Sequence, residues 1–306
     1  MEVSHKITLI IAHFDFSNSY LRNIALQKSL SSIDDEIPIV LIRYVNPKYQ
    51  YLPNRKNLTC IDLNEVGILW QRERFWNLAL QYVDDECENV AWIDSDVYFI
   101  DDNWVQKAIK KLKSTNLIHL FNEVVDKQLI NDEFVDTGLI RRSIMDNPLS
   151  YFHKNYFCNS GISLNLGCSP GFAWAGKTKI IKQCFFPDFL ILGSGDKALL
   201  AAAFGKHEEY AEALKLNFSL ILKYKNWATK FYEEIKGDVS CIHNTIYHLV
   251  QGDYGNRQYS NRYSLIESVA FEFDKLIELS KERTWVWKEE NYFKERVNKY
   301  FINRQD

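Results

Sequence analysis

Apolar and polar residues alternate in blocks along the first third of the chain, and these blocks predict strands and helices in turn. Continuous apolar runs such as Ile7–Ala12 are typical of strands buried on both faces, whereas apolar residues at helical spacing predict helices. The predicted strands are Ile7–Ala12, Pro38–Arg43, Leu58–Leu63, Val90–Ile93 and Leu117–Leu120, and the predicted helices are Asn18–Ser31, Leu69–Val83 and Trp104–Leu112. This order predicts an α/β fold with a mostly parallel central sheet flanked by helices.

The pattern changes at Phe121. Residues 121–170 are rich in aromatic side chains, Gly and Pro and show no clear period. We therefore interpret them as a long irregular segment that contributes to a binding site, the acceptor side of the resemblance given below. Beyond it, strands are predicted at Gly171–Ala175 and Val239–Leu249, and helices at Lys177–Cys184, Lys197–Phe204 and Trp227–Ile235. We expect one domain over residues 1–265, made of halves 1–120 and 121–265, followed by a C-terminal helical extension over 266–306.

Composition narrows the class of protein. The chain has 306 residues, of which 46% are hydrophobic, enough for a large α/β domain. The aromatic content of 14% fits a protein that stacks sugars or bases, and it fits an aromatic core equally well. A net charge of −3 argues against general nucleic-acid binding. The six cysteines are scattered without a C-x-x-C pair, which favours reduced thiols, and no apolar run is long enough to span a bilayer. We therefore expect a soluble cytoplasmic protein.

The strongest chemical signal is Asp94-Ser-Asp96, which ends the buried strand Val90–Ile93. If the chain stays extended, residues i and i+2 point to the same side, so the two carboxylates would repel each other. A divalent cation such as Mg²⁺ or Mn²⁺ relieves this repulsion and can bridge to phosphates. The alternative is a turn or a helix cap. The nearby Asp101 and Asp102 are interpreted as caps of the following helix.

Two later segments carry further candidates, each with a structural alternative. Gly193-Ser-Gly195-Asp196 joins an apolar run to an Ala-rich helix, where Asp196 is either a general base for an acceptor hydroxyl or an N-cap. His248 ends the last predicted strand and is either a metal ligand or a hydrogen-bonded structural histidine.

The remaining candidates would bind the donor. Arg257 and Arg262 could clamp a diphosphate. Arg72 and Arg74, at the start of a helix, could reach the phosphate or base, or could instead pair with Glu73, with Glu65 or with solvent. The strand end at His13 and Asp15 is where a nucleotide would enter an α/β sheet.

Taken in order, these motifs resemble GT-A-fold glycosyltransferases of the DxD type. Three segments also resemble a group of bacterial and bacteriophage glycosyltransferases, namely Gly171-Phe-Ala-Trp-Ala175, Ile191-Leu-Gly-Ser-Gly-Asp196, and His248-Leu-Val-Gln-Gly252 followed by Asn256-Arg-Gln-Tyr259. The layout is similar to that of galactosyltransferases. The resemblance implies metal ligands at Asp96 and His248, with Asp94 on the ribose of the donor or on the metal. It also implies a catalytic base at Asp196 and an acceptor side that includes Trp174 and Gly195.

The resemblance has one departure, because the related group has W-H-G where this chain has Val250-Gln251-Gly252. Gln251 would then be a weaker, neutral ligand. The implied activity is metal-dependent transfer of a sugar, from UDP-hexose by preference, to a hydroxyl acceptor with inversion, using Mn²⁺ or Mg²⁺. The acceptor would be a surface or lipid-linked glycan, or a hydroxymethylated pyrimidine in phage DNA. The alternatives are a non-catalytic sugar-binding module with this fold and a sugar nucleotidyltransferase.

Overall fold

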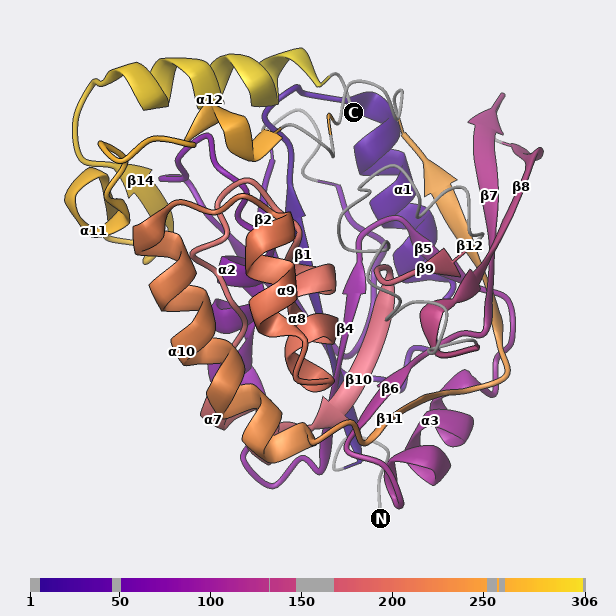
Figure 1. Cartoon of the computed structure of the whole chain (residues 1–306). Helices are drawn as coiled ribbons and strands as arrows, with labels where there is room; N and C mark the ends of the chain where they lie inside the picture. The colour runs from indigo at the N-terminus through magenta and orange to yellow at the C-terminus, as the bar shows by residue number, and fades with distance from the viewer. Residues whose placement is uncertain are drawn as a thin grey trace.

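The computed structural model describes residues 6–45, 51–131, 133–146, 168–251, 258 and 262–304, and the following statements concern these residues. A seven-stranded sheet forms the centre, in the order β11-β6-β10-β4-β1-β2-β3 (Figure 1). Its strands are β1 (Ile7–Phe14), β2 (Ile39–Tyr44), β3 (Leu58–Asp62), β4 (Asn89–Asp94), β6 (Leu117–His119), β10 (Ala173–Lys177) and β11 (Val239–Cys241). Only β10 runs antiparallel to its neighbours, so the predicted mostly parallel sheet is confirmed.

Alternating side chains of the strands assign each face of this sheet to its own hydrophobic core. In β4, Ala91 and Ile93 pack into the core shared with helices α1 (Tyr20–Ser31) and α3 (Trp104–Leu112). Val90 and Trp92 pack into the opposite core, to which most of the other described helices contribute. These helices include α2 (Arg72–Ala79), α7 (Thr178–Cys184), α8 (Gly195–Ala203), α9 (His207–Ala213) and α10 (Phe218–Ile235). Asp94 has the same parity as Trp92 and therefore faces α2 and α8.

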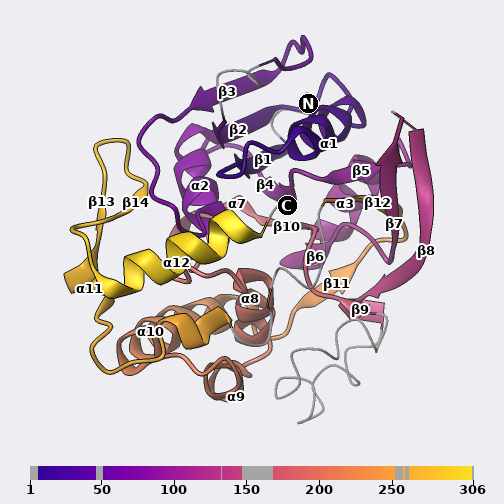
Figure 2. The ribbon, with the colours of Figure 1, turned by 90° about the horizontal axis from the view of Figure 1, so that it is seen from above.

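A second sheet stands beside the first, in the order β5-β12-β7-β8-β9 (Figure 2). Its strands are β5 (Val97–Phe99), β7 (Glu123–Ile130), β8 (Glu133–Ser143), β9 (Cys168–Ser169) and β12 (Thr245–Val250). Two sequence predictions are wrong here. The segment interpreted as irregular begins with the β7–β8 hairpin, and the single strand predicted over Val239–Leu249 is two strands, β11 and β12, that belong to different sheets. Residues 147–167 of that segment lie outside the described part of the chain.

The C-terminal residues pack onto the main core. They form α11 (Phe273–Leu276), the hairpin of β13 (Ile277–Leu279) and β14 (Trp285–Trp287), and α12 (Tyr292–Asn303). Phe271, Val297 and Phe301 are buried in the same cluster as the helices α2 and α8. In Figure 1, α12 lies across the top of the molecule, over the edge at which the parallel strands end. Among the described residues, no helix has both the length and the apolar character needed to cross a membrane.

Candidate active site

Asp94 and Asp96 do not point the same way, because the chain turns between β4 and β5. Asp94 is the last residue of β4, Ser95 and Asp96 form the turn, and β5 enters the second sheet. The prediction that both carboxylates share one side of an extended strand is therefore wrong. Each carboxylate instead belongs to its own cluster of charged residues, one on either side of the turn.

The first cluster is centred on Arg72, at the N-terminus of α2. Its guanidinium group contacts Asp94 Oδ1 at 2.9 Å, Asp196 Oδ2 at 2.9 Å and Glu73 Oε1 at 2.6 Å. We call Arg72, Glu73, Asp94 and Asp196 the arginine cluster. Trp70 also belongs beside it, because the indole Nε1–H donates to Glu73 Oε2 at 2.7 Å. Of the two alternatives for Arg72, pairing with Glu73 is the one observed, and the same side chain also joins the two candidate site carboxylates.

Arg72 is the cation that contacts all three carboxylates of this cluster, and the pKa values of two of them, Asp94 and Glu73, are raised. Burial raises the pKa of the Asp94 carboxyl to about 7, with Asp196 and Asp96 adding to the rise and Arg72 opposing it. Burial likewise raises the pKa of Glu73. The arginine cluster therefore has more negative charge than Arg72 neutralises, a condition that favours binding of a further cation or proton.

Asp196 lies in the first turn of α8, where the helix dipole favours its anion. It is not the N-cap, which is Ser194, so the capping alternative is wrong for this residue. The apolar run before it forms a turn, in which the backbone N–H of Gly193 donates to the carbonyl of Leu190 at 2.8 Å. Gly195 is required by packing, since a Cβ there would lie 2.0 Å from Glu73 Oε1.

The second cluster is centred on His248, in β12. His248 Nδ1 lies 3.0 Å from Asp126 Oδ1, and its Nε2 lies 3.7 Å from Asp96 Oδ2. Arg141, from β8, forms an ion pair with Asp126. We call Asp96, Asp126, Arg141 and His248 the histidine cluster. Burial alone would lower the pKa of the His248 imidazole, but hydrogen bonds to Asp126 and Asp96 outweigh it and raise that pKa. When His248 is protonated, charges of both signs alternate here and balance, whereas a metal ion would bind the neutral imidazole.

The loop before β10 joins the two clusters. Phe172 adopts a left-handed backbone with φ of 79°, which is rare for a bulky residue and is common at functional sites. Its carbonyl accepts from the backbone N–H of Asp94, and its ring lies 4.7 Å from the ring of His248. A Cβ at Gly171 would lie 3.1 Å from Asp196 Oδ2. Trp174 is buried, its indole N–H donates to the carbonyl of Pro170, and its ring packs against that of His119. These contacts fix the position of the loop before β10.

Several predicted donor-binding residues lie in other environments. Asp15 is buried and accepts hydrogen bonds from Ser17 and Asn23, which fixes the loop after β1. Arg74 pairs with Asp188 at 2.9 Å and donates to the carbonyl of Arg283, away from both clusters. The structure thus gives Asp15 and Arg74 structural contacts.

Three further candidates lie close to the clusters, and one is not described. His13 is buried beside the turn, with Nδ1 3.1 Å from Ser95 Oγ, and burial lowers its pKa to about 3, so its ring is neutral. Arg262 donates to Ser194 Oγ and braces the turn before α8. Gln251 is buried directly after β12. Arg257 lies outside the described residues.

The metal prediction can be compared with this geometry. Within the described residues, no three His, Cys, Asp or Glu side chains are arranged to hold a metal ion. Asp96 and His248 do face each other, whereas Asp94, predicted as a further ligand, turns away to Arg72. Sequence reasoning also missed Asp126 and Arg141, because their strands were interpreted as loop.

No family model and no curated protein sequence matches this chain. Solved structures do. TarS 1-349 of S. aureus in complex with UDP-GlcNAc is 15% identical with a TM-score of 0.44, over 81% of this chain and 59% of that one. The mannosyltransferase PcManGT from Pyrobaculum calidifontis, in complex with GDP-Man and Mn²⁺, is 16% identical with a TM-score of 0.38, over 65% and 52%.

A third match is 4-diphosphocytidyl-2C-methyl-D-erythritolsynthase from Anaerococcus prevotii, 12% identical with a TM-score of 0.36, over 87% of this chain and 99% of that one. This chain spans about three fifths of the length of TarS 1-349. A mannosyltransferase is thus among the solved structures to which the chain is similar.

Proposed function

We propose that this chain is a glycosyltransferase, which moves a sugar from a nucleotide diphosphate sugar to a hydroxyl acceptor. One observation carries the proposal. A single turn after β4 places Asp96 beside His248 and Asp94 beside Asp196, at the edge where an open α/β sheet binds ligands. Asp96 and His248, which suit a metal ion and a diphosphate, therefore lie next to Asp196, which suits the proton of an acceptor hydroxyl.

The donor side would use Asp96 and His248. Mg²⁺ is commonly held by one or two carboxylates together with substrate phosphates, and Mn²⁺ also accepts imidazole, so these two side chains fit a divalent cation that the donor diphosphate completes. When bound, the cation would supply charge neutralisation for the departing diphosphate. Gln251 would add a neutral oxygen. The side chain of Asp96 is 18% exposed, so a ligand can reach it.

The acceptor side would use Asp196. Its side chain is 21% exposed, and Arg72 holds one of its oxygens, which leaves the carboxylate fixed and accessible. Asp196 would take the proton of the acceptor hydroxyl, while the hydroxyl oxygen forms a bond to the anomeric carbon and the bond to the diphosphate breaks. Direct attack inverts the anomeric centre. Arg262, and Arg257, which lies outside the described residues, remain proposed as two of the cations for the diphosphate.

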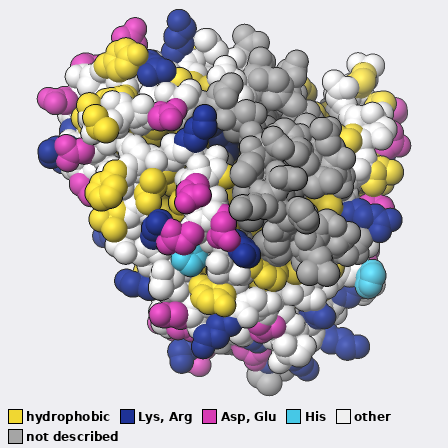
Figure 3. Space-filling view, viewed as in Figure 1, with side chains coloured by type: hydrophobic (Ala, Val, Ile, Leu, Met, Phe, Trp, Pro, Cys, Tyr) yellow, Lys and Arg dark blue, Asp and Glu magenta, His cyan; other side chains and the backbone are white. Residues whose placement is uncertain are grey.

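The acceptor is proposed only as a hydroxyl compound, with a glycan preferred over DNA. Figure 3 shows acidic and basic side chains intermixed over the described part of one face. Duplex DNA favours a continuous basic surface, so the mixed charges on this face agree with the preference.

The test of the donor site is nucleotide binding. Thermal shift and calorimetry with UDP, GDP, dTDP and CMP, each with and without Mn²⁺, should show one nucleotide whose binding strengthens with Mn²⁺. Asp96→Ala should remove the Mn²⁺ effect, while Asp102→Ala, at an exposed acid that follows β5, should keep it. A wild-type protein that binds none of these nucleotides would contradict the proposal.

A further inference from the structure

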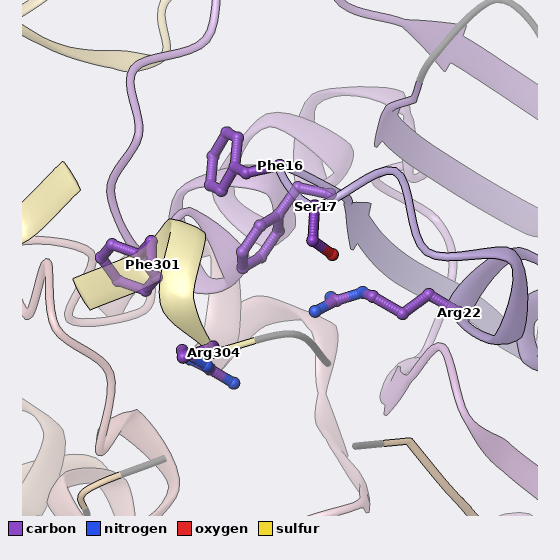
Figure 4. Close-up of a pocket in the computed structure, with 6 residues that line it drawn as sticks. Phe16, Ser17, Arg22, Phe301 and Arg304 are labelled. Atoms are coloured by element: carbon purple, nitrogen blue, oxygen red, sulfur yellow. The ribbon is translucent and has the colours of Figure 1, made fainter. Parts of the chain in front are cut away.

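A pocket lies between the loop after β1 and the end of α12 (Figure 4). Its described lining is Phe14, Phe16, Ser17, Arg22, Phe301 and Arg304. The pocket is open to one side, and the space between these side chains, counted together with the adjoining solvent, is about 240 Å³. The lining comes from the two ends of the chain. None of the motifs in the sequence pointed to α12 as part of a binding site.

The pocket combines aromatic walls with two cations. Arg22 lies over the ring of Phe14 at 5.6 Å, and Arg304 lies over the ring of Phe301 at 5.8 Å. Figure 4 shows both guanidinium groups directed toward the space below Ser17. Arg304 is only 6% exposed, so its side chain forms part of the wall of the pocket. Two arginines that converge beside aromatic rings suit an anion attached to a planar ring.

Contacts connect this pocket to the arginine cluster. The indole of Trp70 lies between two guanidinium groups, 5.3 Å from Arg304 and 5.4 Å from Arg72. Phe14 packs edge-on against Trp70, with the ring centroids 5.3 Å apart. A ligand in the pocket would therefore lie one side chain away from the carboxylates of the proposed reaction.

Contacts also connect the pocket to the Asp94–Asp96 turn. Phe14 ends β1, directly after His13, and His13 contacts Ser95 in the middle of that turn. Burial lowers the pKa of the His13 imidazole, and the positive charge of Arg22 lowers it further. The pocket therefore adjoins the arginine cluster through Trp70, and the backbone of β1 connects it to the Asp94–Asp96 turn.

We propose that this pocket binds the nucleoside diphosphate part of the donor, with Arg22 and Arg304 on the phosphates and the phenylalanine rings beside the base. The inference rests on the proposed function and deepens it. It assigns α12 to the active site, as the element that closes the donor pocket, and it assigns binding roles to two arginines at opposite ends of the chain. The alternative is that Arg304 only neutralises the C-terminus of α12 and stacks on its aromatic neighbours.

The test compares three probes, namely UDP, uridine and inorganic pyrophosphate, by calorimetry on the full chain. A lost charge-assisted hydrogen bond to phosphate corresponds to a loss in affinity of roughly tenfold to a hundredfold. Arg304→Gln and Arg22→Gln should each weaken UDP and pyrophosphate by this factor and leave uridine unchanged. Lys299→Gln, on the exposed side of α12, is the matched control and should change none of the three.

Two further measurements distinguish a loss of binding from a loss of folding stability. Arg304→Lys keeps the charge and should recover part of the UDP affinity, while the melting temperature of each variant reports on packing. A lower melting temperature with unchanged affinity for UDP and pyrophosphate would overturn the inference and support the purely structural role. Donor cleavage with an unaltered KM in both glutamine variants would overturn the inference and leave the proposed function standing. Arginine-dependent UDP binding without any sugar transfer would support the pocket and contradict the proposed function.

Discussion

The arginine cluster and the histidine cluster lie on either side of one turn but balance charge differently. Around Arg72, one cation meets three carboxylates, whereas around His248 the charges alternate along Arg141, Asp126, His248 and Asp96. The first arrangement keeps a carboxylate reactive and fixed, as a base requires. In the histidine cluster, the hydrogen bond between Asp126 and Nδ1 of His248 orients the imidazole, so that Nε2 is positioned to bind a metal ion. Neighbouring acids of the same motif can thus serve different steps.

The largest expected effect comes from removing the cation of the arginine cluster. Arg72→Gln removes the cation that contacts Glu73, Asp94 and Asp196, and a broken buried pair costs about 3–5 kcal/mol of unfolding free energy. Arg141→Gln should cost less, because His248 still pairs with Asp126. Urea unfolding measures both, with Arg142→Gln at an exposed position of β8 as the control. Equal losses for the two buried arginines would remove the distinction between the clusters.

A smaller effect is expected from the carboxylate behind His248. Asp126→Asn keeps the shape of the side chain but weakens its hold on the Nδ1–H of His248, and such a change typically costs 10–100-fold in metal affinity. Titration of Mn²⁺ in the presence of the preferred nucleotide, followed by the paramagnetic resonance of free Mn²⁺, measures this. Asp136→Asn, at an exposed acid of β8, is the matched control. An unchanged Mn²⁺ affinity in Asp126→Asn would contradict the role of His248 as a ligand.

The smallest effect concerns the histidine that supports the loop between the clusters. His119 lies between Phe121 and Trp174, with its ring nitrogens facing Ser143 and the carbonyl of Gly171, and burial lowers its pKa to about 3. Between these two pKa values, the imidazole of His119 is protonated in the unfolded chain, where its pKa is near 6.5, but stays neutral in the folded chain. This contribution to stability is complete above pH 6.5 and is lost as the pH falls toward 3.

Between pH 7 and pH 5, His119 should therefore remove about 2 kcal/mol of stability. The variant His119→Gln should be less stable at pH 7 but should lose less on acidification than the wild type does. His243→Gln, at an exposed position, should retain the wild-type pH dependence in urea unfolding. The same slope in all three proteins would show that His119 does not titrate in this range.

The sequence predicted the central sheet well because its strands are continuous apolar runs and its helices have a clear period. It failed between Glu123 and Ser143, where β7 and β8 carry polar residues on one face and the apolar pattern is weak. A signal was present in the sequence, since Asn is common in hairpin turns, and Asn131 does adopt the positive φ that such turns require. Because this hairpin was interpreted as a loop, Asp126 and Arg141 were missed.

The sequence was sufficient to predict which residues belong to the candidate site, but it did not predict which of their side chains contact one another. Asp94, Asp96, Asp196 and His248 do gather at one edge of the sheet. Which side chains pair depends on one turn, at Ser95, that reverses the expected direction of Asp96. The partner of Arg72 and the place of Arg304 depend on packing between distant segments, which no local pattern encodes.

The central claim is tested most directly by hydrolysis of a panel of UDP-, GDP-, dTDP- and CMP-sugars, with and without Mn²⁺, by the wild type, Asp96→Ala and the control Asp102→Ala. The account predicts that the wild type and the control release one nucleotide in a metal-dependent reaction and that Asp96→Ala does not. Failure of the wild type to release any nucleotide would contradict it and favour a sugar-binding module. Release of pyrophosphate from a nucleoside triphosphate and a sugar phosphate would instead identify a nucleotidyltransferase.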